Sequence, residues 1–424
     1  MKNRLNTAMD QAWDFIWNKL YYPGTGLFYD FLTDHPTDPL CGYLPKPEEI
    51  AIQFPNPCGW GTGMEDSMLN AGSILAMVTD RWQVTGDSAM SEYIDKVLKG
   101  IELCLTVPEN RGFLARSVCP FDKKSYYTNS SRDQYTHVDY GLWYFLKSKL
   151  GTPEQNALCS RLLVDMATYA EKTVVEENYY TILNDNGKQG QVQIMWANPI
   201  PPDPVPGTQS YWPIEPHEVL RLPMMHAAAW YATGDEHWRD MMLKYMDEGI
   251  AHAMKVPGNL FGYCLIQMQL SQHLLYEVEP DETRRKKLAE VMTVTAKQGV
   301  AGMNKTMAYL QKLKGYTSMC GEDWRKCSFR FQEGHLCGGD PFMMPQHADG
   351  FAETDLGVRG FGEKIYIQII TPEYELNREL LRRFVSYCRN FDYENHCVYG
   401  PIYHLMAYWA MRAQGISDEE LEQF

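Results

Sequence analysis

Helices that are apolar on every side alternate along this chain with helices that carry one charged face. This alternation constrains the fold strongly, because a helix that is apolar all round is stable only when other elements surround it. The helical period predicts about twelve helices, near 4–20, 64–83, 88–106, 133–149, 153–174, 216–232, 236–253, 260–276, 281–312, 356–370, 375–390 and 400–414. Those that begin near 64, 133, 216, 260, 356 and 400 are the apolar ones. Six buried helices alternating with six amphipathic ones predict an all-α fold, the (α/α)6 toroid or six-hairpin barrel.

Two turns of nearly the same sequence indicate a repeated helical hairpin. Thr-Gly-Asp occurs at 85–87 and again at 233–235, each time between an apolar helix and the next helix. Gly suits the left-handed residue that ends a helix, and Asp is a preferred N-cap of the one that follows. The segment 149–153 predicts a related turn, with a Thr N-cap and a Pro at the first helical position.

Long connections rich in Gly, Pro and aromatic residues lead into the apolar helices. They span 21–63, 108–131, 176–215 and 316–353. Loops of this length within a compact domain are usually functional. Because each one enters the N-terminus of an inner helix, we expect all of them on one face of the toroid. No linker-like segment interrupts the chain, so a single catalytic domain over 1–424 is predicted.

The composition excludes several classes of function. The chain has 424 residues, a net charge of −15 and no conspicuous basic block, so no nucleic-acid partner is expected. No apolar run approaches the length of a membrane span, so no membrane partner is expected either. Phosphate-binding glycine loops, zinc-protease motifs and nucleophile elbows are absent from the sequence, and we expect neither a cofactor nor a metal. The oligomeric state is left open.

The cysteines and the N-terminal segment bear on the compartment. Eleven cysteines without a C-x-x-C pair favour reduced thiols. The first twenty residues are amphipathic and lack the apolar core and cleavage site of a secretory signal. We therefore expect a cytoplasmic location for this sequence, or a periplasmic one if a signal peptide has been removed.

The segment Thr128–Tyr140 concentrates polar chemistry at the start of the second apolar helix. Ser131 is a good N-cap, and the first turns then carry Arg132, Asp133, Gln134, His137 and Asp139. Asp133 lies in the first turn and faces the loops, whereas Asp139 lies deeper among aromatic residues. Either could be a general acid, since burial raises the pKa of an unpaired carboxyl group. Alternatively, Asp133 only complements the helix N-terminus and Arg132 neutralises it.

Acids also open the first and third apolar helices. Glu65 and Asp66 stand at the start of the first, and His217 and Glu218 at the start of the third. A favourable interaction with the helix dipole accounts for one acid at a helix start, but it accounts less well for two adjacent acids. Aromatic residues lie in the same lead-in segments: Trp60, Trp196, Trp212 and Tyr399. Aromatic platforms with acids and amides between them are typical of a sugar-binding cleft, although such side chains can also simply pack the loops.

With these motifs the chain resembles the six-hairpin glycosidase superfamily. The Thr-Gly-Asp turns and the Ser-Arg-Asp-Gln run at 131–134 carry the resemblance, and the hairpin count extends it over nearly the whole chain. The layout is closest to that of the unsaturated glucuronyl and rhamnogalacturonyl hydrolases, which place one Asp at the start of each of two successive inner helices. The resemblance implies Glu65 or Asp66, together with Asp133 or Asp139, as the catalytic acids. It also implies an Asp that protonates an unsaturated uronate ring and activates water. That family's Trp/Gly-rich lead-in to a later inner helix is not found in its usual form.

We therefore expect a glycoside hydrolase that acts on oligosaccharides from polysaccharide breakdown, with a substrate that contains uronate. Arg132, Arg330 and Arg359 lie in or beside lead-in segments and could form a clamp on the substrate carboxylate. A neutral-sugar glycosidase is an alternative.

Two other classes of function stay open. A sugar epimerase or isomerase of the N-acylglucosamine 2-epimerase type would use histidines as acid and base, here His217, His347 and His404. A non-catalytic carbohydrate-binding protein would need the aromatic residues but not the acids. Acids outnumber well-placed histidines at the inner-helix starts, which favours the hydrolase.

Overall fold

The computed structural model describes residues 4–196, 214–258, 260, 262–312, 321–332, 342–347 and 351–424. The long helices are α1 (Leu5–Phe15), α3 (Ser67–Thr85), α4 (Met90–Thr106), α5 (Arg132–Ser148), α6 (Pro153–Thr173), α7 (Arg221–Thr233), α8 (Glu236–Ala253), α9 (Gly262–Val278), α10 (Glu282–Lys312), α11 (Phe351–Ile369), α12 (Arg378–Asn390) and α13 (Pro401–Ala413). Two short helices are α2 (Pro47–Ala51) and α14 (Asp418–Glu422). One π-helical turn, Ile16–Leu20, extends α1.

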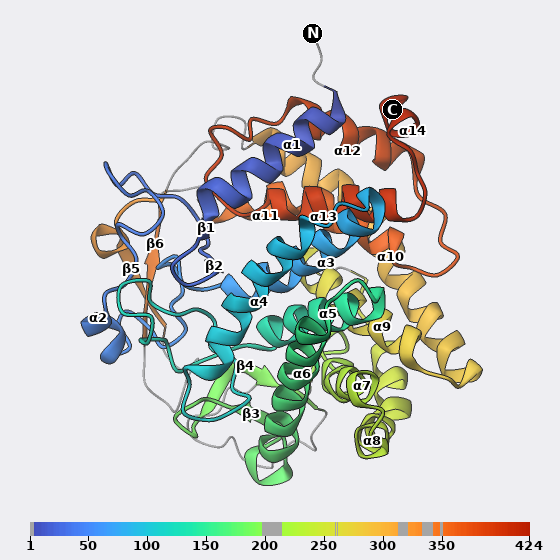
Figure 1. The fold of residues 1–424 in the computed structure, drawn as a ribbon, viewed down its shortest axis with the longest axis horizontal. Coiled ribbons are helices and arrows are strands. Elements are labelled where there is room, and N and C mark those ends of the chain that lie inside the picture. Colours follow the sequence, from blue (N-terminus) through green and yellow to red (C-terminus); the bar gives the residue numbers. More distant parts are fainter. Residues whose placement is uncertain are drawn as a thin grey trace.

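The helices form two concentric rings, as the sequence predicts (Figure 1). Contacts run in a closed cycle through α3, α5, α7, α9, α11 and α13, and α13 returns to α3. The outer helices α4, α6, α8, α10 and α12 pack against this inner ring, and α1 packs against α12 and α13. The fold is therefore an (α/α)6 toroid. Every residue of α3 from Ser67 to Asp80 is buried, which explains why that helix is apolar on all sides.

The predicted hairpin turns are present. Gly86 and Gly234 have φ values of 64° and 69° and end α3 and α7 in the left-handed conformation. The Asp235 side chain accepts a hydrogen bond from the backbone of His237 and caps α8. Local sequence signals therefore place these hairpins correctly.

Two pairs of inner helices approach each other backbone to backbone at glycines. A Cβ atom on Gly72 of α3 would lie 2.0 Å from the His137 carbonyl oxygen of α5, and one on Gly141 would lie 2.5 Å from the Gly72 oxygen. A Cβ atom on Gly362 of α11 would lie 2.1 Å from the Tyr403 oxygen of α13. Only glycine allows this spacing, and it brings the first turns of the paired helices together.

Side chains close the barrel across its axis. The hydroxyl groups of Tyr140 on α5 and Tyr366 on α11 lie 2.9 Å apart, although these two helices stand opposite each other in the ring. His273 of α9 contacts the same Tyr140 hydroxyl through Nδ1 at 2.8 Å. This contact separates two ends of the barrel, one at the inner-helix N-termini and one at their C-termini.

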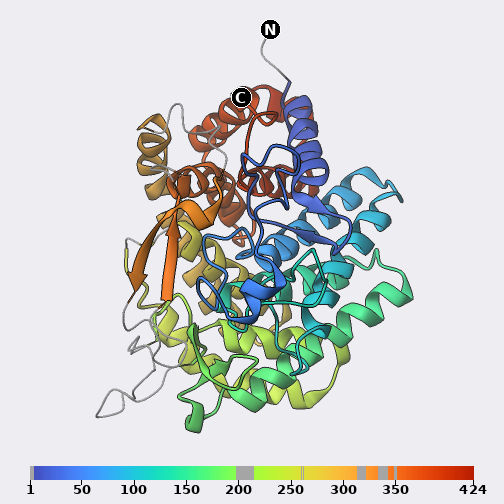
Figure 2. The ribbon, with the colours of Figure 1, turned by 90° about the vertical axis from the view of Figure 1, so that its left-hand side faces the viewer.

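The lead-in segments also contain short antiparallel hairpins that the sequence analysis does not predict. They are β1 (Tyr21–Tyr22) with β2 (Leu27–Phe28), β3 (Thr181–Leu183) with β4 (Gln189–Ile194), and β5 (Ser328–Gln332) with β6 (Phe342–Gln346). These hairpins and the described parts of the long loops gather on one face of the toroid, at the left in Figure 1 and toward the viewer in Figure 2. The expectation that the loops share one face is confirmed.

Some helix boundaries differ from the predicted ones. The third inner helix begins at Arg221 and not near residue 216. Pro223 explains this shift, because proline is tolerated in the first turn of a helix but not farther in. In the part of the chain that the structure describes, no helix is both long and apolar enough to cross a bilayer.

Candidate active site at the start of the inner helices

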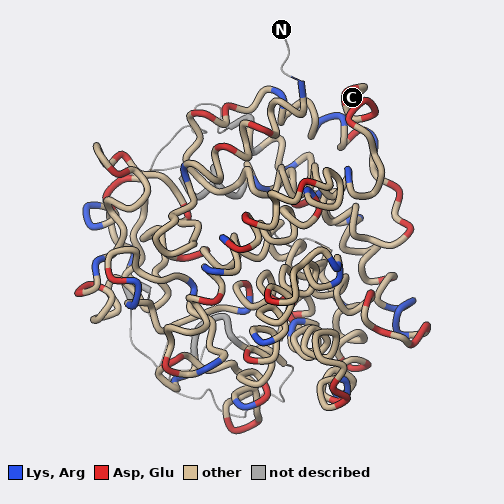
Figure 3. Tube along the Cα trace, viewed as in Figure 1, with Lys and Arg blue, Asp and Glu red and all other residues tan. Residues whose placement is uncertain are grey.

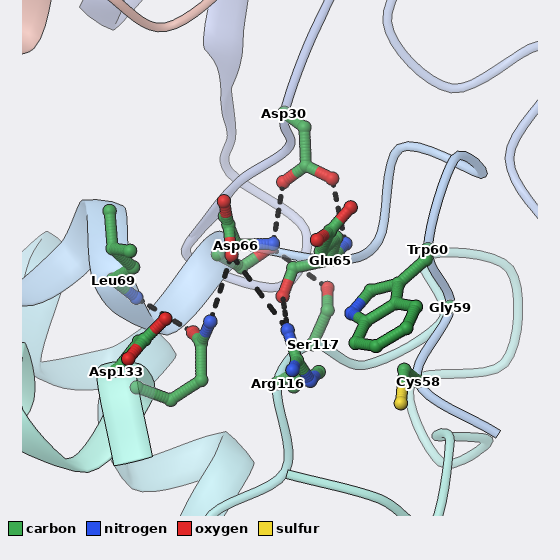
Figure 4. Close-up of polar contacts among 12 residues, drawn as sticks. Asp30, Cys58, Gly59, Trp60, Glu65, Asp66, Leu69, Arg116, Ser117 and Asp133 are labelled. Carbon is green, nitrogen blue, oxygen red and sulfur yellow. Dashed lines mark hydrogen bonds and ion pairs between the residues drawn. The ribbon is translucent and has the colours of Figure 1, made fainter. Parts of the chain in front are cut away.

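The start of α3 is capped from outside the helix. Asp30, which follows β2, accepts hydrogen bonds from the backbone nitrogens of Glu65 at 2.7 Å and Asp66 at 2.8 Å (Figure 4). The Asp66 side chain makes no capping bond. Since Asp30 satisfies these two backbone donors, the carboxyl groups of Glu65 and Asp66 are available for other interactions.

Side chains from two other inner-helix starts hold Asp66. Gln134 Nε2 donates to Asp66 Oδ1 at 2.9 Å, and the Tyr399 hydroxyl donates to Asp66 Oδ2 at 2.9 Å. Arg116 adds a longer ion pair at 3.8 Å. The first turns of α3, α5 and α13 therefore meet at one carboxylate.

Arg116 is a central residue that the sequence analysis misses. It is 4% exposed, donates to the Glu65 carbonyl oxygen at 3.3 Å and lies 5.8 Å from the Trp60 ring centroid. Burial lowers its pKa, but Cys58, Glu65, Asp66 and Asp133 oppose this and the pKa is raised. One guanidinium thus faces acids from two inner helices. An arginine within the apolar stretch 113–118 of a lead-in loop is the signal that could have found it.

Glu65 is half-buried beside this guanidinium. Burial raises the pKa of Glu65 well above its ordinary value, and the neighbouring carboxylates of Asp66 and Asp30 add to this effect, while Arg116 opposes it. A carboxyl group in such surroundings holds its proton at a pH where an ordinary glutamate has lost it. Glu65 is therefore suited to donate a proton.

The pKa of Asp133 is shifted in the opposite direction to that of Glu65. Arg221 NH1 donates to Asp133 Oδ1 at 2.6 Å, and the side chain of Asp133 remains 32% exposed. Burial alone would raise the pKa of Asp133, but the Arg221 guanidinium outweighs it and holds that pKa below the ordinary value. Asp133 is therefore an ionised carboxylate that solvent can reach.

A buried cluster of charges supports Asp133 from the side of α7. Glu218 is 5% exposed and contacts three cationic or basic groups: Arg132 NH2 at 3.1 Å, Arg221 Nε at 2.6 Å and His217 Nε2 at 3.0 Å. Burial raises the pKa of Glu218, but the two arginines dominate and lower it strongly. Arg221, which the sequence analysis misses, also donates to Gln267 of α9 at 2.7 Å. Charged residues of both signs accordingly lie within the ring as well as on its rim (Figure 3).

The arginines proposed as a uronate clamp have different surroundings. Arg132 pairs with Glu218 and also donates to the Ile194 carbonyl at 2.9 Å. Arg359 is 3% exposed and pairs with Glu363 at 2.6 Å, while its NH1 group donates to the Tyr399 hydroxyl at 2.6 Å. Arg359 therefore braces the tyrosine that holds Asp66. Arg330 lies exposed on β5.

Several predicted site residues are almost fully buried. Gln134, His137 and Asp139 are at most 1% exposed, so we no longer expect them to touch a ligand. His137 donates through Nδ1 to the Asp133 carbonyl at 2.9 Å, and burial lowers its pKa to about 4. Trp196 packs against Tyr245 of α8, with ring centroids 4.6 Å apart. Trp212 lies outside the described residues.

The three histidines considered for an epimerase all contact other protein groups, and His217 does so through the Glu218 pair described above. His404 is fully buried, with Nδ1 against the Tyr393 hydroxyl at 3.1 Å and Nε2 donating to the Val358 carbonyl at 2.9 Å. His347 donates to the Gly61 carbonyl at 2.8 Å, next to Trp60. Among the described residues, no group of three or more His, Cys, Asp or Glu side chains is placed to hold a metal ion.

Comparisons with known proteins find solved structures only at low identity. A family 76 glycoside hydrolase from a bovine Bacteroides thetaiotaomicron strain is 11% identical, with a TM-score of 0.48, and the match covers 98% of this chain and 79% of that one. Cellobiose 2-epimerase from Spirochaeta thermophila is 12% identical, with a TM-score of 0.49, and the match covers 97% and 98% of the two chains. No family model and no curated protein sequence matches the chain. We transfer no activity from either neighbour at this identity.

Proposed function

We propose that this protein is a glycoside hydrolase that cleaves an oligosaccharide by acid–base catalysis. One observation carries the proposal: Glu65 and Asp133, at the starts of neighbouring inner helices, have pKa values shifted in opposite directions. Two carboxyl groups whose surroundings separate their protonation states are the arrangement that glycosidic cleavage requires. The Arg116 guanidinium interacts electrostatically with both carboxyl groups.

Each residue has a definite role in this mechanism. Protonated Glu65 gives its proton to the glycosidic oxygen as the bond to the leaving group breaks. Ionised Asp133 either activates water or attacks the anomeric carbon, depending on the separation of the two carboxyl groups in the complex. The ring of Trp60, beside Arg116, offers an apolar face to a sugar. Asp66 uses both carboxylate oxygens within the protein, so it is a positioning residue and not the base.

The charges at the site favour a neutral sugar over a uronate. Two of the three arginines considered for a carboxylate clamp, Arg132 and Arg359, already pair with Glu218 and Glu363. Protein carboxylates within a few ångströms therefore largely neutralise the positive charge of these two arginines, and salt screens such close interactions only weakly. A substrate carboxylate would also have to approach the ionised Asp133.

The proposal is tested by replacing the proton donor and varying the leaving group. Glu65→Gln cannot protonate a poor leaving group, so hydrolysis of unactivated oligosaccharides should fall by about 10² to 10⁴-fold. Aryl glycosides with an acidic phenol leave without help, and their hydrolysis should fall far less. Glu154→Gln is the matched control, since Glu154 is exposed in the first turn of the outer helix α6.

Two results would contradict this proposal. If Glu65→Gln hydrolyses unactivated oligosaccharides at the wild-type rate, then Glu65 is not the acid. If the wild type returns sugars with intact glycosidic bonds and one inverted hydroxyl-bearing carbon, an epimerase is the better assignment.

A further inference from the structure

Gln134 joins the first turns of two inner helices. Its Nε2 atom donates to Asp66 Oδ1 at 2.9 Å, and its Oε1 atom accepts from the Leu69 backbone nitrogen at 2.8 Å. A carboxylate only accepts and a backbone N–H only donates, so these partners determine the orientation of the amide. Gln134 has no exposed surface, so it acts on the protein and not on a ligand.

This bridge lies directly beside the acid–base pair. Gln134 follows Asp133 in α5. Its two partners are Asp66, which directly follows Glu65 and precedes α3, and Leu69, which lies in the first turn of α3. Lower down, α3 and α5 touch at Gly72 and Gly141. The two helices are therefore held at two levels, and the upper attachment sets the relation between Glu65 and Asp133.

We infer that Gln134 is a positioning residue that fixes the separation of the two catalytic carboxyl groups. This inference rests on the proposed function, because it assigns Gln134 a task in the same reaction. A misplacement of about 1 Å at a catalytic group can lower the rate about 10²-fold. Loss of this hydrogen-bonded amide should therefore lower the catalytic rate much more than it lowers the stability of the fold.

The charged groups around Gln134 allow a specific test. Asp66 accepts from Gln134 just before α3, with Glu65 preceding it in the chain, and Asp133 precedes Gln134 in α5. Arg116 and Tyr399 both contact Asp66, the first from the lead-in loop and the second from just before α13. In Gln134→Glu, a protonated side chain still donates to Asp66 through its hydroxyl group and accepts from Leu69 through its carbonyl oxygen. An ionised side chain can only accept, and it repels Asp66.

Gln155 provides a matched control far from the site. Its Nε2 atom donates to Asp95 Oδ1 at 2.7 Å, and its Oε1 atom accepts from the Thr152 backbone nitrogen at 3.0 Å. It is 5% exposed at the start of the outer helix α6. Gln155→Glu therefore makes the same chemical change between a carboxylate and a backbone N–H without altering the acid–base pair.

The experiment measures kcat, KM and melting temperature against pH for the wild type and three variants. Gln134→Met should lower kcat about 10²-fold at every pH while KM changes by less than about threefold. Gln134→Glu should be just as impaired at alkaline pH but regain most of its activity relative to the wild type as the pH falls and the new carboxyl group takes up a proton, which burial and the neighbouring Asp66 carboxylate make it do at a higher pH than an ordinary glutamate. Gln155→Glu should lose stability as pH rises but keep kcat within about twofold of the wild type.

The outcomes separate this inference from the proposed function. If the wild type hydrolyses oligosaccharides and Gln134→Met keeps its kcat within about twofold, the positioning role is wrong and the proposed function stands. The role is equally wrong if Gln134→Glu and Gln155→Glu lose activity together in proportion to their melting temperatures. If the folded wild type hydrolyses no oligosaccharide, the proposed function fails, and the positioning role fails with it.

Discussion

The two ends of the barrel bury carboxyl groups in different ways. At the N-terminal end three acids have arginine partners: Asp133 with Arg221, Glu218 with Arg132 and Glu363 with Arg359. At the C-terminal end Asp80 of α3 has no exposed surface and accepts a hydrogen bond from the Tyr144 hydroxyl at 2.7 Å. Asp80 follows Asp66 by fourteen residues, about 21 Å along the same helix.

This difference shows how one ring of inner helices can hold two kinds of carboxyl group. Burial raises the pKa of Asp80 to about 7, because the Tyr144 hydroxyl and the more distant Lys147 only partly offset the loss of hydration. An arginine in direct contact reverses the same effect at Asp133. The arginine partner keeps Asp133 ionised, whereas the tyrosine hydroxyl leaves Asp80 with a carboxyl group that is easily neutral.

Removing the charge of Asp133 should have the largest effect. Asp133→Asn keeps the shape and the acceptor for Arg221 but cannot serve as base or nucleophile, so kcat/KM should fall about 10³-fold with little change in melting temperature. Asp165→Asn is the control, since Asp165 on α6 also accepts from an arginine, Arg111, at 2.8 Å. If Asp133→Asn keeps an activity close to that of the wild type, Asp133 has no catalytic role and only stabilises the start of α5.

Removing the arginine should destabilise the site end of the barrel. Arg221→Met leaves Asp133 and Glu218 without a shared partner, and breaking a buried pair in this way typically costs about 3–5 kcal/mol of unfolding free energy. Arg161→Met removes a half-exposed partner of Glu102 and should cost less than about 1 kcal/mol. Urea unfolding compares the two variants. Equal losses would mean that burial does not distinguish these ion pairs.

The C-terminal end should control part of the pH dependence of stability. The folded-state pKa of Asp80, about 7, exceeds its ordinary value of 3.8, so the folded protein binds this proton more tightly than the unfolded chain. The contribution of Asp80 to the free energy of unfolding is therefore fully present below about pH 4 and is lost as the pH rises toward 7. Asp80→Asn keeps an acceptor for Tyr144 and should raise the melting temperature by a few degrees at pH 8 but not at pH 4.

The exposed Asp87, in the turn after the same helix, provides the control for Asp80. Asp87→Asn should leave the slope of melting temperature against pH unchanged. If Asp80→Asn leaves it unchanged as well, the Asp80 carboxyl group is ionised in the folded protein and the contrast between the two ends disappears.

Substrate charge should have the smallest effect. Because Arg132 and Arg359 already pair with protein carboxylates, a neutral oligosaccharide should be hydrolysed at least as well as its uronate counterpart. The test compares a uronate oligosaccharide with its carboxyl-reduced analogue in the wild type and in Arg132→Met, Arg330→Met and Arg359→Met. The neutral-sugar assignment would be wrong if the wild type hydrolysed the uronate oligosaccharide faster than the reduced analogue and one of the three variants lost part of this preference. That result would establish a uronate clamp.

Local patterns along the chain were enough to predict the helices and their order. Helical periodicity, left-handed glycines and N-caps are local properties, so the alternating helices, the Thr-Gly-Asp turns and the position of Asp133 in a first helical turn could all be predicted. The same signals placed Glu65 and Asp66 at the start of the first inner helix. The short hairpins in the lead-in loops carried no comparable periodicity, because strands of two to six residues are too short to show one clearly.

Which acid has a raised pKa and which a lowered one could not be predicted from local patterns. That difference depends on contacts between residues far apart in the chain: Arg221 with Asp133, Arg116 with Asp66, and Asp30 with the start of α3. The tertiary structure also turned Gln134 from a predicted ligand contact into a bridge between helices. A carboxyl group's pKa depends on the charges and the burial around it in space, and those are settled only when the ring of helices closes.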